Sequence, residues 1–237
     1  MKQGRREFIV MAGTLVAAGA LPFNASAADK KMKIGIIGSG NVGGAIGASW
    51  VRAGHEVMFS SRDIEHDKAL AAKLGGGARA GTPREAAAFG DVVMISVPYH
   101  ALPAVGKDVG DLIKGKIVID TNNPFLQRDG DTGKWALEKG AGLASKELLP
   151  GARIVRAFNA IAAAKMGAAY QEPGKVGMPI ASDDAQAIEV ASRLIRDVGY
   201  EPVLIGGLEK GKYLMPGTAL AGERNAEEIR KIAAGLN

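Results

Sequence analysis

Short apolar runs alternate with segments of helical periodicity from residue 32 onward. The run 91–97 carries almost no polar position, which is typical of a strand that is buried on both faces. Strands that alternate with helices predict a parallel sheet with helical crossovers. The expected strands are 33–37, 57–60, 78–80, 91–97, 116–120, 153–157, 177–181 and 202–205, and the expected helices are 41–53, 64–74, one opening at 82–85, 135–149, 182–198 and 225–234.

Local signals support several of these elements. Thr82, Pro83 and Glu85 have the spacing of a helix N-cap, first position and capping box. Asp63 is placed to cap the helix that follows it. Residues 121–133 are rich in Asn, Asp, Gly and Pro, so we expect them to form a long functional loop.

The pattern predicts an α/β fold, a Rossmann-type doubly wound, mainly parallel sheet with a small C-terminal lobe. Residues 28–157 would form the dinucleotide-binding domain. The stretch 158–237 is shorter and less regular, and we expect it to extend the sheet and add a small acceptor-binding lobe.

Residues 1–27 have the pattern of an export signal. Lys2, Arg5 and Arg6 precede a mostly apolar run from Phe8 to about Phe23, and the small residues 25–27 follow that run. The run is too short and too rich in Gly and Ala for a bilayer span of about 20 strongly apolar residues. The arginine pair, with a large apolar residue two positions on, resembles a twin-arginine signal. We expect export to the periplasm without stable membrane insertion after leader removal; an uncleaved anchor, or a cytoplasmic protein with an unused leader, is the alternative.

Composition narrows the classes of function. The 237 residues are 47% hydrophobic and 23% charged, which excludes a disordered chain and a polytopic membrane protein. The absence of Cys excludes disulfides and thiolate chemistry, and three His leave little room for a metal centre. Part of the net charge of +5 belongs to the leader, and no basic stripe interleaved with aromatics is present, so we expect no nucleic-acid partner. The oligomeric state stays open, a homodimer included.

A glycine-rich turn follows the first expected strand. Residues 38–43 read Gly-Ser-Gly-Asn-Val-Gly and open a helix, which is the context that makes this spacing a dinucleotide fingerprint. The first Gly permits the tight turn, the second lets the backbone approach a diphosphate, and the third lets the helix pack on the strand. The predicted diphosphate-binding residues are Gly38, Ser39, Gly40, Asn41, Val42 and Gly43.

The end of the second strand favours NADP over NAD. An NAD site normally carries an acidic residue there, whereas this chain has Ser60, Ser61 and Arg62. Hydroxyls and a guanidinium bind a 2′-phosphate that a carboxylate would repel. A solvated surface role for Arg62 is the alternative.

The ends of the later strands are expected to face the nicotinamide. They carry Val97, Pro98 and Tyr99, then Asn123 and Pro124, and finally Asn159. Pro98 would bend the backbone against the nicotinamide ribose, and the two asparagines could hydrogen-bond the ribose or the carboxamide.

One histidine is placed for acid–base work. His100 follows the strand 91–97. The alternative is a histidine that only packs locally in the loop and has no catalytic role. His55 lies at the opposite edge and is expected to be structural. The catalytic residues are otherwise unknown, and we predict no metal site.

Taken together, these stretches resemble the family of F420-dependent NADP oxidoreductases, whose second coenzyme is a deazaflavin. The resembling segments are KIGIIGSGNVGGAI, FSSRD, DVVMISVPYHAL, DTNNPFLQRDG, VRAFNAI and GKVGMPIASDDAQA. The resemblance implies hydride transfer between NADP(H) and the deazaflavin across a cleft. It also implies diphosphate contacts at 38–42, 2′-phosphate contacts at Ser61 and Arg62, and an acceptor pocket walled by 213–216.

Three functions remain to be separated. The leading interpretation is an NADP(H)-dependent oxidoreductase that transfers hydride to or from a flavin-like acceptor such as coenzyme F420 or a flavin. A reductase of a small imine or carbonyl compound is the second, although such relatives append a long helical domain. The third is an NADP-binding module or partner subunit without turnover of its own.

Overall fold

Eight strands form one sheet in the computed structural model, which describes residues 31–236. Their order is β3-β2-β1-β4-β5-β6-β7-β8, and neighbouring strands are parallel except β6 and β7. This order confirms the predicted doubly wound α/β fold. The strands are β1 (Lys33–Ile37), β2 (Glu56–Ser60), β3 (Ala78–Ala80), β4 (Val92–Ile95), β5 (Ile117–Asp120), β6 (Arg153–Arg156), β7 (Gly177–Ala181) and β8 (Glu201–Gly206).

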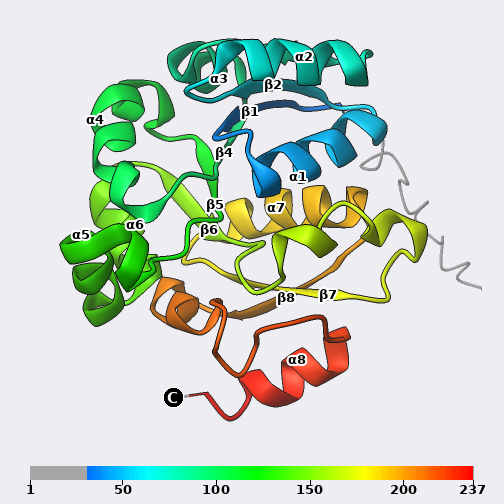
Figure 1. Cartoon of the computed structure of the whole chain (residues 1–237). Helices are drawn as coiled ribbons and strands as arrows, with labels where there is room; N and C mark the ends of the chain where they lie inside the picture. The colour runs from blue at the N-terminus through cyan, green and yellow to red at the C-terminus, as the bar shows by residue number, and fades with distance from the viewer. Residues whose placement is uncertain (1–30, 237) are drawn as a thin grey trace, which may run out of the picture. The chain divides into compact units, whose positions relative to one another are not determined.

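Helices connect the parallel strands and cover both faces of the sheet (Figure 1). They are α1 (Asn41–Arg52), α2 (Ile64–Leu74), α3 (Pro83–Phe89), α4 (Leu102–Ile113), α5 (Leu126–Lys139), α6 (Ala141–Leu148), α7 (Ala185–Asp197) and α8 (Ala226–Ala233), with 3₁₀ turns η1 (Tyr99–Ala101), η2 (Ala163–Lys165), η3 (Ala169–Gln171) and η4 (Leu208–Tyr213). Within the described residues, no helix is both long and apolar enough to cross a membrane.

The alternation of side chains along the strands divides the core in two. Val92 and Met94 of β4 belong to the cluster that also contains residues of α1 and α7, whereas Val93 and Ile95 join the cluster on the α4–α6 side. Successive strand residues point to opposite faces, so a run that is apolar throughout buries both. The indole of Trp50 in α1 also donates a hydrogen bond of 2.8 Å to the Leu194 carbonyl in α7.

The predicted helix caps are present. The Thr82 hydroxyl accepts the Glu85 N–H, and the Glu85 carboxylate accepts the Thr82 N–H, which forms the capping box. Asp63 caps α2 by accepting the His66 N–H at 3.0 Å. Local sequence was sufficient here because a cap involves residues only three positions apart.

The predicted long loop at 121–133 is wrong. Helix α5 begins at Leu126, so the connection after β5 is only a few residues long. The buried Asp129 accepts the Phe125 N–H, one of the free donors at the helix start, at 2.8 Å. Gly130 then takes a φ of 52°, which lets the helix change direction without a Cβ penalty. The predicted helix 135–149 is likewise two helices, because Gly140 has a φ of 90°.

The C-terminal part adds β7 and β8 to the sheet, joined to β6 by a single antiparallel pair, Arg156 with Ala181. A small separate core lies between β8, η4 and α8 and contains Val203, Leu214 and Ile229. The division into domains at 157/158 stays a prediction. The predicted leader, 1–27, lies outside the described residues.

Candidate functional site

The glycine turn after β1 has the conformation that its three glycines predict. Gly38 has a φ of 99°, and a Cβ there would overlap the Ser96 carbonyl of the neighbouring β4 end. A Cβ on Gly43 would overlap the Gly38 carbonyl, whereas a Cβ on Gly40 would meet no atom within 4 Å. The first and third glycines therefore serve close packing, and the second faces open space at the start of α1.

The turn is held by the end of β2. The N–H groups of Gly38 and Ser39 both donate to the Ser60 carbonyl, at 2.8 and 3.1 Å. The Ser60 side chain is fully buried and donates to the Ile36 carbonyl at 2.7 Å. Ser60 thus ties β2 to β1 and to the turn, and the 2′-phosphate role predicted for it stays a prediction.

A buried carboxylate that was not predicted from the sequence joins the two predicted phosphate sites. Asp67 of α2 is fully buried and accepts the Ser39 hydroxyl on one oxygen and the Ser61 hydroxyl, at 2.9 Å, on the other. The residue occupies the inward face of α2 together with Ala71. The sequence signal that could have revealed it is a charged residue at a position of the helix period that is otherwise apolar.

Arg62 is exposed and forms no hydrogen bond or ion pair with any described residue. It follows Ser61, whose hydroxyl is only partly buried. The strand end therefore presents a positive charge that no protein carboxylate neutralises.

The ends of β4 and β5 are joined through Asn122. Its Oδ1 accepts the Val97 N–H at 2.7 Å, which ends β4 two residues earlier than predicted. Its N–H and Nδ2 both donate to Asp120, at 2.9 and 2.6 Å. Because Val97 also packs against Gly38, the strand-end cluster and the glycine turn are contiguous.

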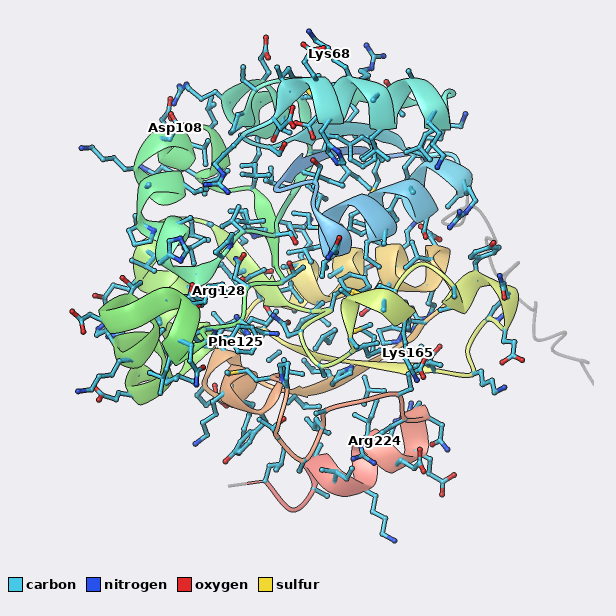
Figure 2. The ribbon with its side chains drawn as sticks, in the orientation of Figure 1. Lys68, Asp108, Phe125, Arg128, Lys165 and Arg224 are labelled. Atoms are coloured by element: carbon cyan, nitrogen blue, oxygen red, sulfur yellow. The ribbon has the colours of Figure 1, made fainter. Side chains whose placement is uncertain are left out.

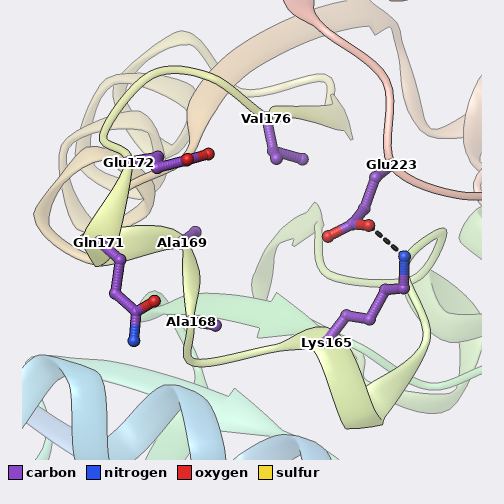
Figure 3. A pocket seen from close by; sticks show the side chains of 7 residues that line it. All are labelled: Lys165, Ala168, Ala169, Gln171, Glu172, Val176 and Glu223. Carbon is purple, nitrogen blue, oxygen red and sulfur yellow. Dashed lines mark hydrogen bonds and ion pairs between the residues drawn. The ribbon is translucent and has the colours of Figure 1, made fainter.

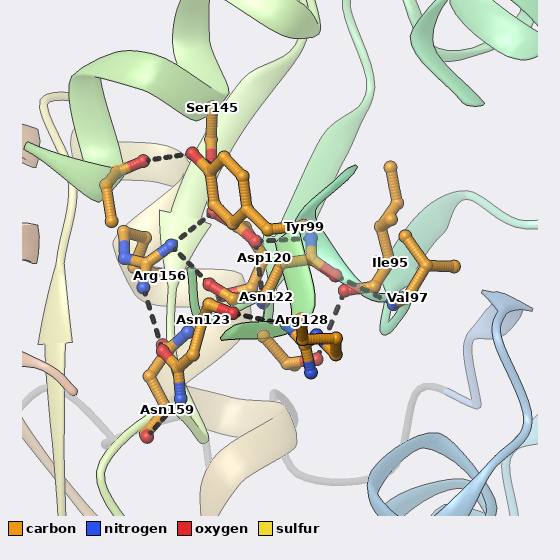
Figure 4. A network of polar contacts seen from close by, with 12 residues as sticks. Ile95, Val97, Tyr99, Asp120, Asn122, Asn123, Arg128, Ser145, Arg156 and Asn159 are labelled. Carbon is orange, nitrogen blue, oxygen red and sulfur yellow. Dashed lines mark hydrogen bonds and ion pairs between the residues drawn. The ribbon is translucent and has the colours of Figure 1, made fainter. Parts of the chain in front are cut away.

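A buried ion pair organises this edge of the sheet (Figure 4). The Arg156 Nη1 lies 2.7 Å from Asp120 Oδ2, and both side chains are fully buried. The guanidinium also donates to the Asn122 carbonyl at 3.0 Å and to Asn123 Oδ1 at 3.3 Å, whereas its Nε has no partner. Gly142 and Gly211 leave room for its aliphatic stem. No sequence pattern marked Asp120 or Arg156 as a pair, because they lie on different strands.

Asn123 and Asn159, predicted to face the nicotinamide, do lie together. Asn123 Nδ2 donates to the Asn159 carbonyl at 2.8 Å, and Asn159 Nδ2 donates to the Asp120 carbonyl at 3.2 Å. Asn159 Oδ1 is buried and has no partner. The preceding Phe158 has a φ of 62°, a conformation that is costly for a bulky residue and that redirects the chain at this point.

The other predicted residues of these loops differ in exposure. Tyr99 is fully buried, and its hydroxyl donates to the Ala141 carbonyl at 2.9 Å and lies 3.0 Å from the Ser145 hydroxyl. Burial raises the pKa of Tyr99 far above its usual range. Pro124 is buried and Pro98 is exposed. The Tyr99 ring therefore belongs to the core beneath α6.

His100 is paired with a buried carboxylate. Its Nδ1 lies 2.8 Å from Asp129 Oδ1, and 48% of the His100 side chain is exposed while that of Asp129 is fully buried. Burial alone would raise the pKa of Asp129, but hydrogen bonds from Arg128, Phe125 and His100 hold it well below its usual range. Arg128 also donates to the Asn123 carbonyl at 2.6 Å.

The exposed surface next to the His100–Asp129 pair is partly apolar. The Phe125 side chain is 37% exposed, and the Arg128 guanidinium lies over its ring at 4.9 Å from the centre (Figure 2). By contrast, the residues 213–216 that the resemblance placed at an acceptor pocket include the buried Leu214 and Met215.

A separate pocket of about 280 Å³ lies between η2, η3 and the segment before β7 (Figure 3). Lys165 and Glu223 form an ion pair on one side of it, and Glu172 stands on the other. No predicted site residue lines it. Within residues 31–236, no group of three or more His, Asp or Glu could hold a metal ion.

Comparison with known proteins identifies relatives. Residues 33–124 match the family model described as NADP oxidoreductase, coenzyme F420-dependent. The F420-dependent NADP reductase of Methanothermobacter thermautotrophicus is 30% identical over 197 residues, which cover 77% of this chain and 84% of the relative.

Two solved structures have the same fold. A hypothetical protein of Sinorhizobium meliloti, SMa0349, is 26% identical with a TM-score of 0.68, covering 81% of this chain and 93% of that one. A putative F420-dependent NADP-reductase of Arthrobacter is 19% identical with a TM-score of 0.60, covering 76% and 87%. The extent of the match to the Methanothermobacter relative shows that this chain belongs to the F420-dependent NADP oxidoreductase family and is an NADP-dependent oxidoreductase.

Proposed function

We propose that the protein transfers hydride between NADP(H) and a flavin-like acceptor, with coenzyme F420 as the leading candidate. The observation that carries the proposal is the common position of three features: the glycine turn, the Ser61–Arg62 turn and the asparagine cluster. All lie at the carboxyl ends of parallel strands, where open α/β sheets bind ligands.

The dinucleotide fits the residues present. The open space at Gly40 leaves the start of α1 accessible to a diphosphate, because no Cβ stands in front of the backbone N–H groups. Arg62, exposed and without a protein partner, is suited to a 2′-phosphate. Ser61 would contribute its hydroxyl beside it.

The nicotinamide side is served by the asparagine cluster. The buried Asn159 Oδ1 lacks a hydrogen-bond donor, and a carboxamide N–H₂ would supply one. Asn123, held by Arg156 and Asn159, and the exposed Pro98 would complete this side. When bound, the reduced nicotinamide supplies the hydride, and the chain's part is to align it with the acceptor.

The proposal for the acceptor rests on the Methanothermobacter relative, whose name gives coenzyme F420 as the partner of NADP. A flavin-like ring needs alignment more than a strong catalytic dyad. Flavins, quinones and small carbonyl compounds are the other acceptors to compare.

The experiment mixes the purified protein with NADPH and follows absorbance at 340 nm while each acceptor is added in turn. For coenzyme F420, loss of the deazaflavin absorption should accompany NADPH oxidation in equal amounts. NADPH oxidation with another acceptor but not with F420 would reassign the acceptor. Binding of NADPH without oxidation by any of them would contradict the proposal.

We also propose that residues 1–27 direct export by the twin-arginine route, which is supported only by their sequence pattern. The test is cell fractionation with the native leader and with Arg5→Lys/Arg6→Lys. Export that persists in the double variant would argue against this route.

A further inference from the structure

His100 and Asp129 form a pair whose geometry fixes the position of a proton. Asp129 Oδ1 accepts from His100 Nδ1 at 2.8 Å and from the His100 backbone N–H at 3.2 Å. A carboxylate can only accept, so Nδ1 must carry the hydrogen. In the neutral ring, the lone pair is then on Nε2.

Asp129 is well suited to hold that tautomer. Arg128 donates to both of its oxygens, at 2.9 and 2.8 Å, and the Phe125 N–H donates at 2.8 Å. These donors keep the carboxylate charged although it is buried, which agrees with the lowered pKa of Asp129. The orientation of the imidazole therefore does not depend on the proton content of Asp129 near neutral pH.

His100 Nε2, in contrast, has no partner among the described residues, and nearly half of the side chain is exposed. From α5, Asp129 and Arg128 are the charged groups that contact this pair, and α4 has no acidic residue in its first turn. One ring nitrogen is thus fixed by the protein, and the other is open to a ligand.

The pair belongs to the candidate site through Arg128. This guanidinium contacts Asp129 and donates to the Asn123 carbonyl, and Asn123 in turn donates to the Asn159 carbonyl. His100 is therefore connected by consecutive hydrogen bonds to the side chains proposed for the nicotinamide. A histidine buttressed by a buried carboxylate is the arrangement that general acid–base catalysis uses.

We propose that His100 donates, from Nε2, the proton that accompanies hydride transfer to the acceptor, with Asp129 as a positioning residue. This rests on the proposed function. NADPH gives hydride (H⁻, with both electrons of the broken C–H bond) to the electrophilic atom of the acceptor, and protonated His100 gives H⁺ to a conjugated nitrogen or oxygen of the same molecule. The products are NADP⁺, the reduced acceptor and neutral His100, which regains a proton from water.

A proton donor at this position restricts the class of acceptor. The acceptor must carry an electrophilic ring atom that takes hydride, conjugated to a nitrogen or oxygen that takes a proton. Ring nitrogens of deazaflavins and flavins and the oxygens of quinones meet this condition. One-electron oxidants do not.

The first experiment uses His100→Asn, because the ring is half exposed and its loss leaves no cavity in a packed core. We expect kcat for NADPH oxidation to fall about 10²-fold or more. The Kd for NADPH, measured by calorimetry, should be unchanged. Added imidazole should restore part of the turnover of His100→Ala, which a structural role alone would not permit.

The second experiment compares Asp129→Asn with Asp131→Asn, an exposed residue two positions along α5. Asp129→Asn should lower kcat and displace the limb of the pH–rate profile that disappears in His100→Asn. Asp131→Asn should leave both as in the wild type. If Asp129→Asn does not fold, His100→Asn carries the test alone.

A third measurement does not depend on turnover. Nitrogen-15 spectra of histidine-labelled protein, assigned with His100→Asn, should show neutral His100 with its hydrogen on Nδ1. An Nε2–H tautomer, or full kcat in His100→Asn with any acceptor, overturns the inference and leaves the proposed function standing. If the wild-type protein fails to oxidise NADPH with every acceptor tested, the proposed function is wrong. The nitrogen spectra still decide the geometry of the pair in that case.

Discussion

Arg156 Nη1 lies 2.7 Å from Asp120 Oδ2, with both side chains fully buried at the ends of adjacent strands. Removing one partner of such a pair leaves an uncompensated buried charge, which costs about 3–5 kcal/mol. We therefore expect Arg156→Met to lower the free energy of unfolding by about that amount, measured by urea denaturation.

The matched control for this pair is the double variant Asp120→Asn/Arg156→Met, in which no buried charge is left alone. It should be more stable than Arg156→Met. Equal or lower stability of the double variant would show that the ion pair does not organise this edge. Because Arg156 also contacts Asn123, both variants should weaken NADPH binding.

Arg62→Asp tests the assignment of NADP. The variant places a carboxylate where an exposed guanidinium without a protein partner now stands. NADPH binding should weaken by about 1.5–3 kcal/mol, the scale of a charged hydrogen bond, and NADH binding should change far less. Lys73→Asp makes the same change of charge at the other end of α2 and should affect neither cofactor strongly. Equal losses for NADPH and NADH in Arg62→Asp would refute the 2′-phosphate role.

Substitution by alanine should affect stability at one glycine of the turn and NADPH affinity at another. Gly43→Ala places a Cβ onto the Gly38 carbonyl, so we expect a loss of stability of about 1–3 kcal/mol, visible in thermal melts. Gly40→Ala meets no atom within 4 Å and should fold normally. Its methyl group would stand in front of the α1 start, so NADPH affinity should fall. Wild-type affinity in Gly40→Ala would mean that the diphosphate does not approach this position.

The Asp184–Arg153 pair makes stability depend on acid pH. Hydrogen bonds from Arg153, at 2.7 Å, and from the Ala187 N–H lower the pKa of Asp184 to about 2. The ordinary value is about 3.9. Because the folded-state pKa is depressed, this contribution is present above pH of about 4 and is lost as pH falls through about 2.

Asp184→Asn isolates that contribution, since Asn is also a good N-cap for α7. We expect the variant to be less stable by about 1 kcal/mol or less at pH 6 and to approach the wild type near pH 2. A difference that persists unchanged at pH 2 would assign it to the cap and not to the charge.

Elements whose cause is local were predictable. The glycine spacing predicted the turn after β1, and the residues 82–85 predicted the capping box, because these structures involve side chains and backbone a few positions apart. The run of apolar residues at 91–97 predicted a strand buried on both faces. The start of helix α5 was missed because Asn, Asp and Gly usually indicate loops, and only the buried surroundings of Asp129 show why this segment is helical.

The amino-acid pattern alone thus determined the succession of the eight strands, the turn for a dinucleotide and the family, whereas helix α4 and the start of α5 were not predicted. Three relationships were decided by the tertiary structure: Asp67 between Ser39 and Ser61, Arg156 against Asp120, and His100 against Asp129. The partners in each are 6 to 36 positions apart. An unpaired charge is strongly unfavourable in the interior, so each buried charged group needs a partner. Only the tertiary fold decides which group, distant in sequence, becomes that partner.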